Sequence, residues 1–200
     1  MNQIKNSGGS ALSIKKDISS EESIIELFNF IDKKIGPVNA VVNNAGINGG
    51  VIKNEEISFD ILLPLFRLNV FSILIIIREA VKRMKNSGGG AIVNISSESA
   101  RFGGNKLSHY AASKAAVNAA TIALAKELAH YDIRINSVSP GVIETDMNKN
   151  LSEDRLKYIY DSLPFGRMGK PIEVAELVCW LLSEKASYVS GSIIPVTGAR

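Results

Sequence analysis

The sequence has only one cysteine and almost no net charge, and each of these features excludes a class of protein. Its one cysteine, Cys179, cannot form a disulfide within the chain. Because Cys179 stands in the apolar segment 175–183, we expect a buried thiol in a reducing compartment. The 23 basic and 20 acidic residues leave a net charge of only +3, and the basic residues are scattered. This excludes the clustered basic face of a nucleic-acid-binding protein.

Long hydrophobic runs are also missing. The first 17 residues contain no apolar core of signal-peptide length. Elsewhere charge interrupts the apolar stretches before they reach membrane-spanning length. We therefore expect a cytoplasmic protein with no membrane partner, and we predict no metal site.

The remaining composition is that of one folded domain. Hydrophobic residues make up 46% and charged residues 22% of the 200 residues, near the averages for globular proteins. A chain of this length can bury a core of its own. With neither repeats nor a linker, we predict a single domain over residues 1–200.

Short apolar runs alternate with amphipathic stretches along the chain. The runs predict strands at residues 11–14, 38–42, 91–96, 133–139 and 191–196. The stretches predict helices at 19–36, with Ser19 and Glu22 as a capping box, at 58–85, broken into two at Pro64, at 108–131 and at 171–184. This alternation indicates an α/β fold with a doubly wound, mostly parallel sheet.

The helix at 108–131 carries Tyr110 and Lys114 four positions apart, roughly 6 Å apart at Cβ. A free tyrosine has a pKa of about 10, and a neighbouring cation favours the phenolate. Lowering that pKa to about 7 requires about 4 kcal/mol. An isolated pair with this spacing is usually an ordinary helix contact, so the neighbouring motifs must decide its role.

Three predicted strands end in polar or turn-forming residues. Ser97 follows one strand and stands thirteen residues before Tyr110, Asn-Asn-Ala-Gly occupies 43–46, and a Pro-Gly turn begins at Pro140. Ligands of open α/β sheets bind at the carboxyl ends of strands. We therefore expect these three strand ends to share one crevice.

Taken in order, these motifs resemble the short-chain dehydrogenases/reductases, and the resemblance runs from residue 1 to residue 200. The matching elements are Asp17-Ile18, Asn43-Asn44-Ala45-Gly46, Asn69, Ser97, Tyr110, Lys114 and Pro140-Gly141-Val142-Ile143-Glu144-Thr145. The resemblance implies a Rossmann-like fold. It also implies an NAD(P)-dependent oxidoreductase that interconverts a small-molecule carbonyl and a secondary alcohol.

The resemblance assigns catalytic roles to four residues. Tyr110 would be the general acid in reduction and the general base in oxidation, while Ser97 would hydrogen-bond the substrate oxygen. Lys114 would lower the tyrosine pKa and hold the nicotinamide ribose. Asn69 would hold a water that links Lys114 to solvent, with Pro64 loosening its helix.

The resemblance also assigns contacts to NAD or NADP. Asp17 and Ile18 would lie beside the adenine, although Asp17 could instead be a turn former. Asn44, Ala45 and Gly46 would line the adenosine side, although Asn43 and Asn44 could instead tie strands together. The remaining contacts would come from Tyr110, Lys114, Pro140, Gly141, Ile143 and Thr145.

The sequence departs from the family pattern at its start. The family opens with a strand, a glycine-rich turn and a helix that binds pyrophosphate. Here Met1 falls just before the family's third strand, so that roughly 40 residues, the first strand-helix-strand unit, are missing. The glycines at 8–9, 49–50 and 88–90 are in the wrong context to replace that turn. The choice between NAD and NADP therefore cannot be inferred, and a catalytically silent fragment acting as a binding or assembly module is the alternative.

Two further expectations concern the substrate and assembly. The segment 148–169 falls where the family builds its substrate lid. The helices around 73–81 and 108–131 carry more apolar positions than one sheet face needs, which predicts a homo-oligomer, a tetramer or a dimer. An acyl-transfer site using Ser97 has little support, because His109 and His130 occupy no obvious position as its base.

Overall fold

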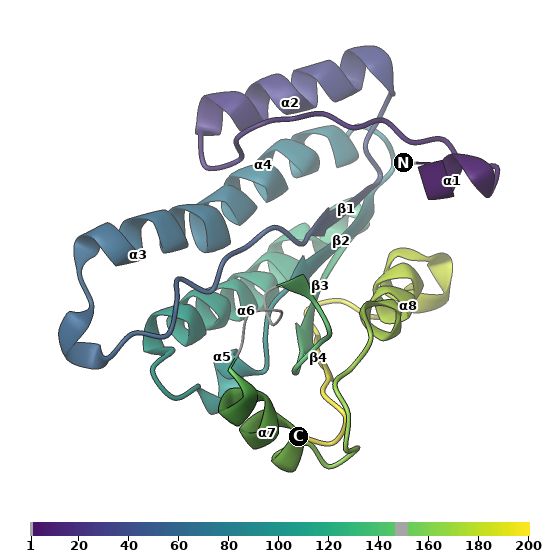
Figure 1. Ribbon diagram of the computed structural model, residues 1–200. Helices are drawn as coiled ribbons and strands as arrows, with labels where there is room; N and C mark the ends of the chain where they lie inside the picture. Colours follow the sequence, from purple (N-terminus) through teal and green to yellow (C-terminus); the bar gives the residue numbers. More distant parts are fainter. Residues whose placement is uncertain (1, 147–151) are drawn as a thin grey trace.

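The computed structural model describes residues 2–146 and 152–200, and its centre is a four-stranded parallel sheet (Figure 1). The strands are β1 (Ala40–Asn43), β2 (Gly90–Ile95), β3 (Ile133–Pro140) and β4 (Ile193–Val196). They lie side by side in the order of the sequence, and each neighbouring pair is parallel. Each connection therefore returns the chain from one end of the sheet to the other through helical segments that pack on a face of the sheet. The predicted α/β fold with a parallel sheet is confirmed.

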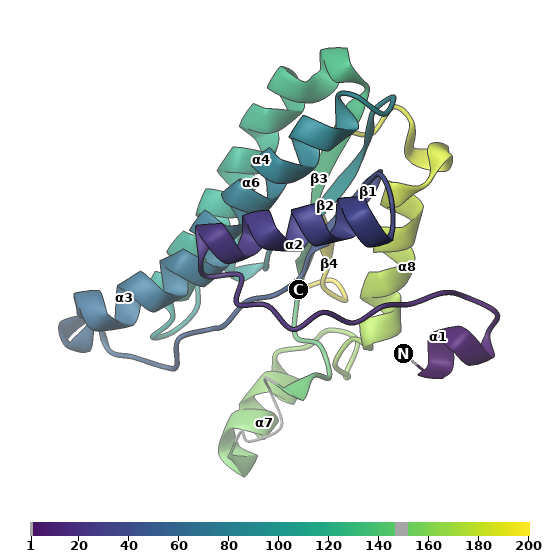
Figure 2. The same ribbon diagram turned by 90° about the horizontal axis from the view of Figure 1, so that it is seen from above.

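Helices cover both faces of this sheet (Figure 2). The longer ones are α2 (Glu21–Lys34), α3 (Phe59–Phe66), α4 (Ser72–Met84), α6 (Ser108–Leu128), α7 (Glu153–Asp161) and α8 (Pro171–Leu182). The shorter ones are α1 (Asn2–Asn6), α5 (Ser99–Phe102), and the 3-10 turns η1 (Asn54–Glu56), η3 (Ala129–Tyr131) and η5 (Glu184–Ala186). The N-cap of α2 lies one residue later than predicted, since the hydroxyl of Ser20, not Ser19, accepts the Ser23 N–H at 3.2 Å.

The larger part of the core lies between the sheet and helices α2, α4 and α6. Its fully buried members include Ile24, Met84, Ile92, Leu128 and Ile135. Helix α6 packs on β3, and α2 packs on α4. Burial of these side chains, at about 25 cal/mol per Å² of apolar surface, fixes the orientation of α6 on the sheet.

A smaller core lies on the opposite face, between β2, β3 and α8. Val93, Val138 and Leu181 are buried there. The Arg134 guanidinium donates to the carbonyl of Leu181 at 2.7 Å, at the end of α8. Because Val178 and Leu181 turn inward, Cys179 faces solvent. The prediction that this thiol is buried is wrong.

The predicted strand at residues 11–14 is also wrong. The segment is extended but belongs to none of the four strands, and Leu12 is 56% exposed. In both views it runs along α2 rather than in the sheet (Figures 1 and 2). An apolar run of this length forms a strand only where a neighbouring strand edge accepts its hydrogen bonds.

The long helix expected at 58–85 is continuous through Pro64, contrary to the predicted break. Its irregularity lies just beyond, in the π-helical turn η2 (Arg67–Phe71), which joins α3 to α4. Proline has no N–H to donate and crowds the preceding turn, which favours such a local rearrangement. Asn69 lies in the middle of the π-turn.

The region Phe59–Met84 is long and apolar enough to cross a membrane by length and composition, and an 18-residue window within it has a mean hydropathy of 2.1. Arg67 interrupts the apolar residues 61–77, as expected, but a single charge does not prevent the region from meeting this criterion. In the fold, Ile73, Ile77 and Met84 lie in the core. Core helices of folded domains commonly meet the same criterion.

Candidate active site

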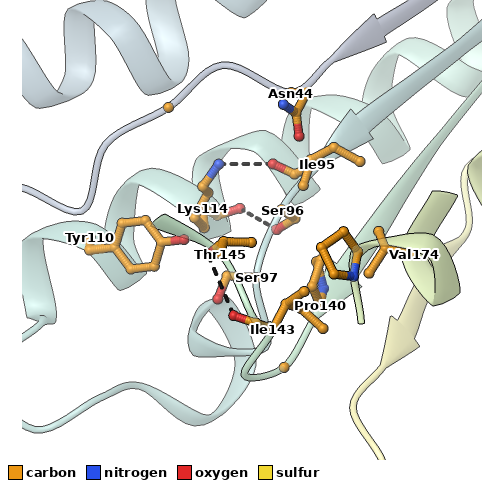
Figure 3. A pocket seen from close by; sticks show the side chains of 13 residues that line it. Asn44, Ile95, Ser96, Ser97, Tyr110, Lys114, Pro140, Ile143, Thr145 and Val174 are labelled. Carbon is orange, nitrogen blue, oxygen red and sulfur yellow. Dashed lines mark hydrogen bonds between the residues drawn. The ribbon is translucent and has the colours of Figure 1, made fainter. Parts of the chain in front are cut away.

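A cavity of about 250 Å³ opens at the carboxyl ends of the strands (Figure 3). Its lining residues are Asn44, Gly46, Ile95, Ser96, Ser97, Tyr110, Lys114, Pro140, Gly141, Ile143, Thr145, Pro171 and Val174. Asn44 follows β1, Ser97 follows β2, and Pro140 ends β3. The three strand ends therefore converge on one crevice, as their position in a parallel sheet predicts.

Ser97 is positioned by the turn between β2 and α5. Its Oγ accepts the Ser99 N–H at 3.1 Å, and the Glu98 N–H donates to the Pro140 carbonyl at 3.0 Å. The first contact uses a lone pair of Oγ and leaves the hydroxyl proton available to donate. The preceding residue, Ser96, donates to the Lys114 carbonyl at 3.2 Å and so ties β2 to α6.

Tyr110 lies in the first turn of α6, with its phenol directed toward Ser97 in the cavity (Figure 3). Burial raises the pKa of the phenol above its ordinary value of 10, and a hydrogen bond with Ser97 acts in the opposite direction. The expected lowering of this pKa by Lys114 is therefore absent in the protein alone. The Lys114 Nζ lies 5.9 Å from the centre of the Tyr110 ring, and desolvation of the phenolate is the largest cause of the shift.

Lys114 follows one turn later, and its side chain is almost fully buried. The Nζ donates to the Ile95 carbonyl at 2.8 Å, at the end of β2 (Figure 3). Burial lowers the pKa of the ammonium to about 8, because the charged form loses solvation. Since an ammonium has three N–H groups, two remain to bind a ligand in the cavity.

Asn69 reaches the site from the π-turn but does not line the cavity. Its amide accepts the Ile47 N–H at 3.0 Å and donates to the Ile47 carbonyl at 2.8 Å. It also donates to the Ser113 hydroxyl at 3.1 Å. The side chain thus holds the loop after β1 against α6. A water between Asn69 and Lys114 stays a prediction.

The segment after β3 forms the opposite wall. The Gly141 N–H donates to the Val196 carbonyl at 2.9 Å, and a Cβ at this position would lie 3.1 Å from the Thr197 Cα. Glycine therefore allows the wall to pass close to the end of β4. Ile143 pairs with Gly169, which links the wall to the start of α8.

Three residues assigned to the cofactor do not line the cavity. Asp17 accepts the Ser19 N–H at 2.9 Å and the Ser19 hydroxyl at 2.7 Å, which is the turn-forming role left open by the sequence. Ile18 packs against the core. Ala45 lies exposed between Asn44 and Gly46.

Sequence reasoning missed four lining residues: Ile95, Ser96, Pro171 and Val174. Ile95 and Ser96 precede Ser97 on the same strand end, so their place could have been inferred. Pro171 and Val174 begin α8, and only the folding of α8 over the sheet brings them to the cavity.

The segment 148–169, expected to form a lid, is described from residue 152 onward, and residues 148–151 lie outside the described residues. Ile159, Leu163 and Met168 form a small apolar cluster with Val142. Phe165 is 66% exposed. The cluster packs on the β3 wall, whereas its closure over a substrate stays a prediction.

The cavity fits the nicotinamide and ribose end of NAD(P). A Cβ at Gly46 would lie 3.1 Å from the Asn69 Oδ1 and 3.4 Å from the Lys114 Nζ, so glycine lets the loop after β1 pass close to these two polar groups. The hydroxyls of Ser97 and Tyr110 line the same space. None of the glycine segments at 8–9, 49–50 and 88–90 leads directly into an α-helix, so none forms the pyrophosphate turn.

Over residues 2–146 and 152–200, no three His, Cys, Asp or Glu side chains are grouped so that they could hold a metal ion. The donors that converge on the cavity are hydroxyls, an ammonium and backbone groups. Such a set binds an oxygen-rich organic ligand.

The known proteins to which this chain is similar agree with one another in kind. A family model described as enoyl-(acyl carrier protein) reductase matches residues 1–198. The chain is 41% identical to an uncharacterized oxidoreductase, YgfF, of Escherichia coli K12, over all of this chain and 83% of that protein. It is 35% identical to the 3-oxoacyl-[acyl-carrier-protein] reductase FabG of Thermotoga maritima, over 91% of this chain and 74% of that protein.

Solved structures agree with these relatives. A 7α-hydroxysteroid dehydrogenase, in complex with NADH and 7-oxo glycochenodeoxycholic acid, superposes with a TM-score of 0.93 at 32% identity, over 98% of this chain and 77% of that one. A short-chain type dehydrogenase/reductase from Mycobacterium marinum superposes with a TM-score of 0.94 at 33% identity, over 99% of this chain and 78% of that one. The chain therefore belongs to the short-chain dehydrogenases/reductases, a family of NAD(P)-dependent oxidoreductases.

Proposed function

We propose that this oxidoreductase interconverts a ketone and a secondary alcohol, with Tyr110 as the proton-transfer group. The observation that carries the proposal is the convergence of Ser97, Tyr110 and Lys114 on one cavity at the carboxyl end of β2. An acyl-transfer function has less support, because neither His109 nor His130 lines that cavity.

The geometry favours reduction of a carbonyl. Because burial raises the pKa of Tyr110, the phenol is protonated at neutral pH and can act as a general acid. When bound, the reduced nicotinamide supplies a hydride to the carbonyl carbon. Tyr110 donates its proton to the carbonyl oxygen, Ser97 holds that oxygen by a hydrogen bond, and the phenolate recovers a proton from solvent. Such positioned proton transfer is worth about 10² to 10⁴ in rate.

Lys114 would act on both the cofactor and the phenol. Its two unused N–H groups would bind the hydroxyls of the nicotinamide ribose, and its charge would stabilise the phenolate as it forms. Asn44, Gly46, Pro140, Gly141, Ile143 and Thr145 would hold the cofactor from the two walls. The cofactor is NAD or NADP, and the described residues favour neither.

The substrate we propose is a ketone on an apolar skeleton. Ile95, Ile143 and Val174 make one side of the cavity apolar. A 3-oxoacyl thioester and an oxosteroid, the kinds of compound named for the relatives, both match this description. An enoyl thioester, which the family model's description suggests, would make less use of two hydroxyls placed for a single oxygen.

We also propose that the protein is a cytoplasmic homo-oligomer. The support is that Phe71, Leu74 and Ile122, in η2, α4 and α6, are large apolar side chains that are 51%, 40% and 44% exposed. Light scattering of purified protein that gave a monomer mass would contradict the oligomer. The location rests on a single cysteine in the chain, and microscopy of a fluorescent fusion tests it.

The decisive experiment follows NADH and NADPH absorbance with a panel of 3-oxoacyl thioesters, oxosteroids and enoyl thioesters. We expect ketone-dependent oxidation of one cofactor, and at least a hundredfold loss in Tyr110→Phe. The matched control is Tyr188→Phe, whose ring is fully exposed and lies outside the cavity. Cofactor oxidation that persists in Tyr110→Phe would contradict the mechanism. Binding without turnover would favour the silent binding module.

A further inference from the structure

His109 is a buried side chain that the proposed mechanism does not use. It lies next to Tyr110 in α6 and is only 3% exposed. Its Nε2 lies 3.1 Å from the Asn48 carbonyl oxygen. A carbonyl can only accept, so Nε2 carries a proton and donates it. The other ring nitrogen, Nδ1, is buried and has no partner.

The ring also fits against a glycine of the same loop. Gly49 has φ +74°, and a Cβ built there would lie 3.1 Å from the His109 Cδ2 and 3.2 Å from its Nε2. The absence of a side chain at Gly49 thus lets the loop backbone pass close to the imidazole. His109 meets two successive loop residues, one by a hydrogen bond and one by close packing.

These contacts belong to the loop that carries Asn44 and Gly46 into the cavity. Asn69 fixes the loop at Ile47 through its amide, and His109 fixes the next residue, Asn48. Residues 44–46 themselves are exposed or only partly buried. The loop is therefore held from α6 and from the π-turn.

We propose that His109 is a positioning residue for the cofactor: it holds the loop 44–50 in the conformation in which Asn44 and Gly46 line the cavity that would receive the cofactor. This rests on the proposed function and adds a residue to it. His109 transfers no proton, because Nε2 is committed to a carbonyl and Nδ1 lies buried outside the residues that line the cavity. Its effect passes through the loop backbone.

The experiment compares His109→Leu, which removes the donor, with His109→Gln, whose amide keeps one. His130→Leu is the matched control, because His130 is exposed and its ring lies tilted against Tyr131, away from the loop after β1. Dissociation constants for NADH and NADPH are measured by fluorescence, kcat and cofactor KM by absorbance, and amide hydrogen exchange on the protein without ligand. Circular dichroism and thermal unfolding show which variants fold.

We expect His109→Leu to weaken cofactor binding about fivefold to tenfold, the equivalent of one lost hydrogen bond. Cofactor KM should rise by the same factor while kcat changes less. Exchange should increase at the amides of 46–50 and not in the sheet. His109→Gln should restore most of both effects, and His130→Leu should change neither.

A second pair of variants tests the packing contact. Gly49→Ala should weaken cofactor binding when His109 is present. It should weaken binding less in the His109→Ala protein, because the alanine side chain at position 109 leaves room for the new methyl group at position 49. Purely additive effects would show that the two residues do not act together.

The proposal is overturned if a folded His109→Leu protein shows unchanged exchange in residues 46–50. It is also overturned if exchange increases equally across the sheet, since that would be a general loss of stability. If the wild-type protein bound neither cofactor, the proposed function would fail, whereas the exchange measurement would still decide whether His109 holds the loop.

Discussion

The Lys114 ammonium donates its hydrogen bond to the Ile95 carbonyl at 2.8 Å and not to the Tyr110 phenol one turn away. The lysine thus binds the end of β2, and the tyrosine remains a buried neutral phenol. In the protein alone, each group has the pKa that burial imposes on it. The motif implies that the Lys114 charge lowers the pKa of Tyr110, and this effect requires a ligand bound between the two side chains.

Replacing Lys114 by methionine should stabilise the protein while abolishing activity. Burial lowers the ammonium pKa from 10.5 to about 8, a desolvation cost of up to about 3 kcal/mol. Loss of the bond to Ile95 offsets part of the gain, so we expect the free energy of unfolding in urea at pH 7 to rise by about 1 to 2 kcal/mol. A fall in that free energy would contradict the prediction.

The same substitution should change how stability depends on pH. A base whose folded pKa lies below its unfolded value destabilises the fold while both states are protonated. This cost is relieved between about pH 8 and the unfolded pKa of about 10.4. Wild-type stability should therefore rise toward alkaline pH relative to Lys114→Met. Parallel stability curves from pH 7 to 10 would rule this out.

Reductive activity should fall as pH rises through about 8, because Lys114 then loses the charge that binds ribose and stabilises the phenolate. The measurement is a pH profile of kcat/KM for the ketone found in the substrate panel. Lys114→Arg, which keeps its charge to higher pH, should move the fall to more alkaline values in whatever activity it retains. An identical profile in the two proteins would show that another group titrates.

Glu79→Gln should lower the free energy of unfolding by about 2 to 3 kcal/mol. The Glu79 carboxylate is 5% exposed and pairs with Arg78, Lys82 and Arg83 at 2.7 to 3.1 Å. Burial alone would raise the pKa of Glu79, but hydrogen bonds from these three cations bring it below its ordinary value. A carboxylate with a lowered folded pKa contributes its stability above the unfolded value of about 4.3, and loses it as pH falls through the folded one.

The control for this prediction is Glu127→Gln, at an exposed position of α6. Its free energy of unfolding should change by less than about 0.5 kcal/mol. Equal effects of the two substitutions in urea titrations would show that the buried cluster adds nothing specific.

Two asparagines, Asn94 and Asn118, should respond in opposite directions to replacement by leucine. Asn94 accepts from the Asn43 amide at 2.8 Å and donates to the Thr121 hydroxyl at 2.9 Å, whereas the Asn118 side-chain oxygen is buried without a partner. We expect Asn94→Leu to cost about 2 to 4 kcal/mol and Asn118→Leu to be neutral or stabilising by up to about 1 kcal/mol. Thermal unfolding of both proteins checks the signs.

Much of the site could be predicted because strand ends are visible in the sequence. Ser97 follows an apolar run, and Tyr110 and Lys114 share a helix face at a fixed spacing. These local relations survive folding, since the parallel sheet brings the carboxyl ends of its strands together. The order of motifs along the chain then identified the family.

The predictions that were wrong concerned features that depend on contacts with residues distant in the sequence. The run at 11–14 has strand-like residues but lies beside α2, because no sheet edge receives it. Cys179 sits in an apolar segment yet faces solvent, since the packing of Val178 and Leu181 sets the rotation of α8. The direction of the Tyr110 pKa depended on depth of burial, which spacing alone does not give. The contact of His109 with the loop after β1 could not be predicted, because its partner, the Asn48 carbonyl, is a backbone group that any residue would supply.

The π-turn at Arg67–Phe71 holds one residue more than a regular turn would. One extra residue turns the remainder of a helix by about 100° about its axis. The side chains of the π-turn and those of the helix after it can therefore point in different directions although the helix is continuous. Asn69 meets the loop after β1, and Ile73 and Ile77 still meet the sheet. Deletion of a single residue from the π-turn would therefore remove either the contact of Asn69 with the loop or the contacts of Ile73 and Ile77 with the sheet.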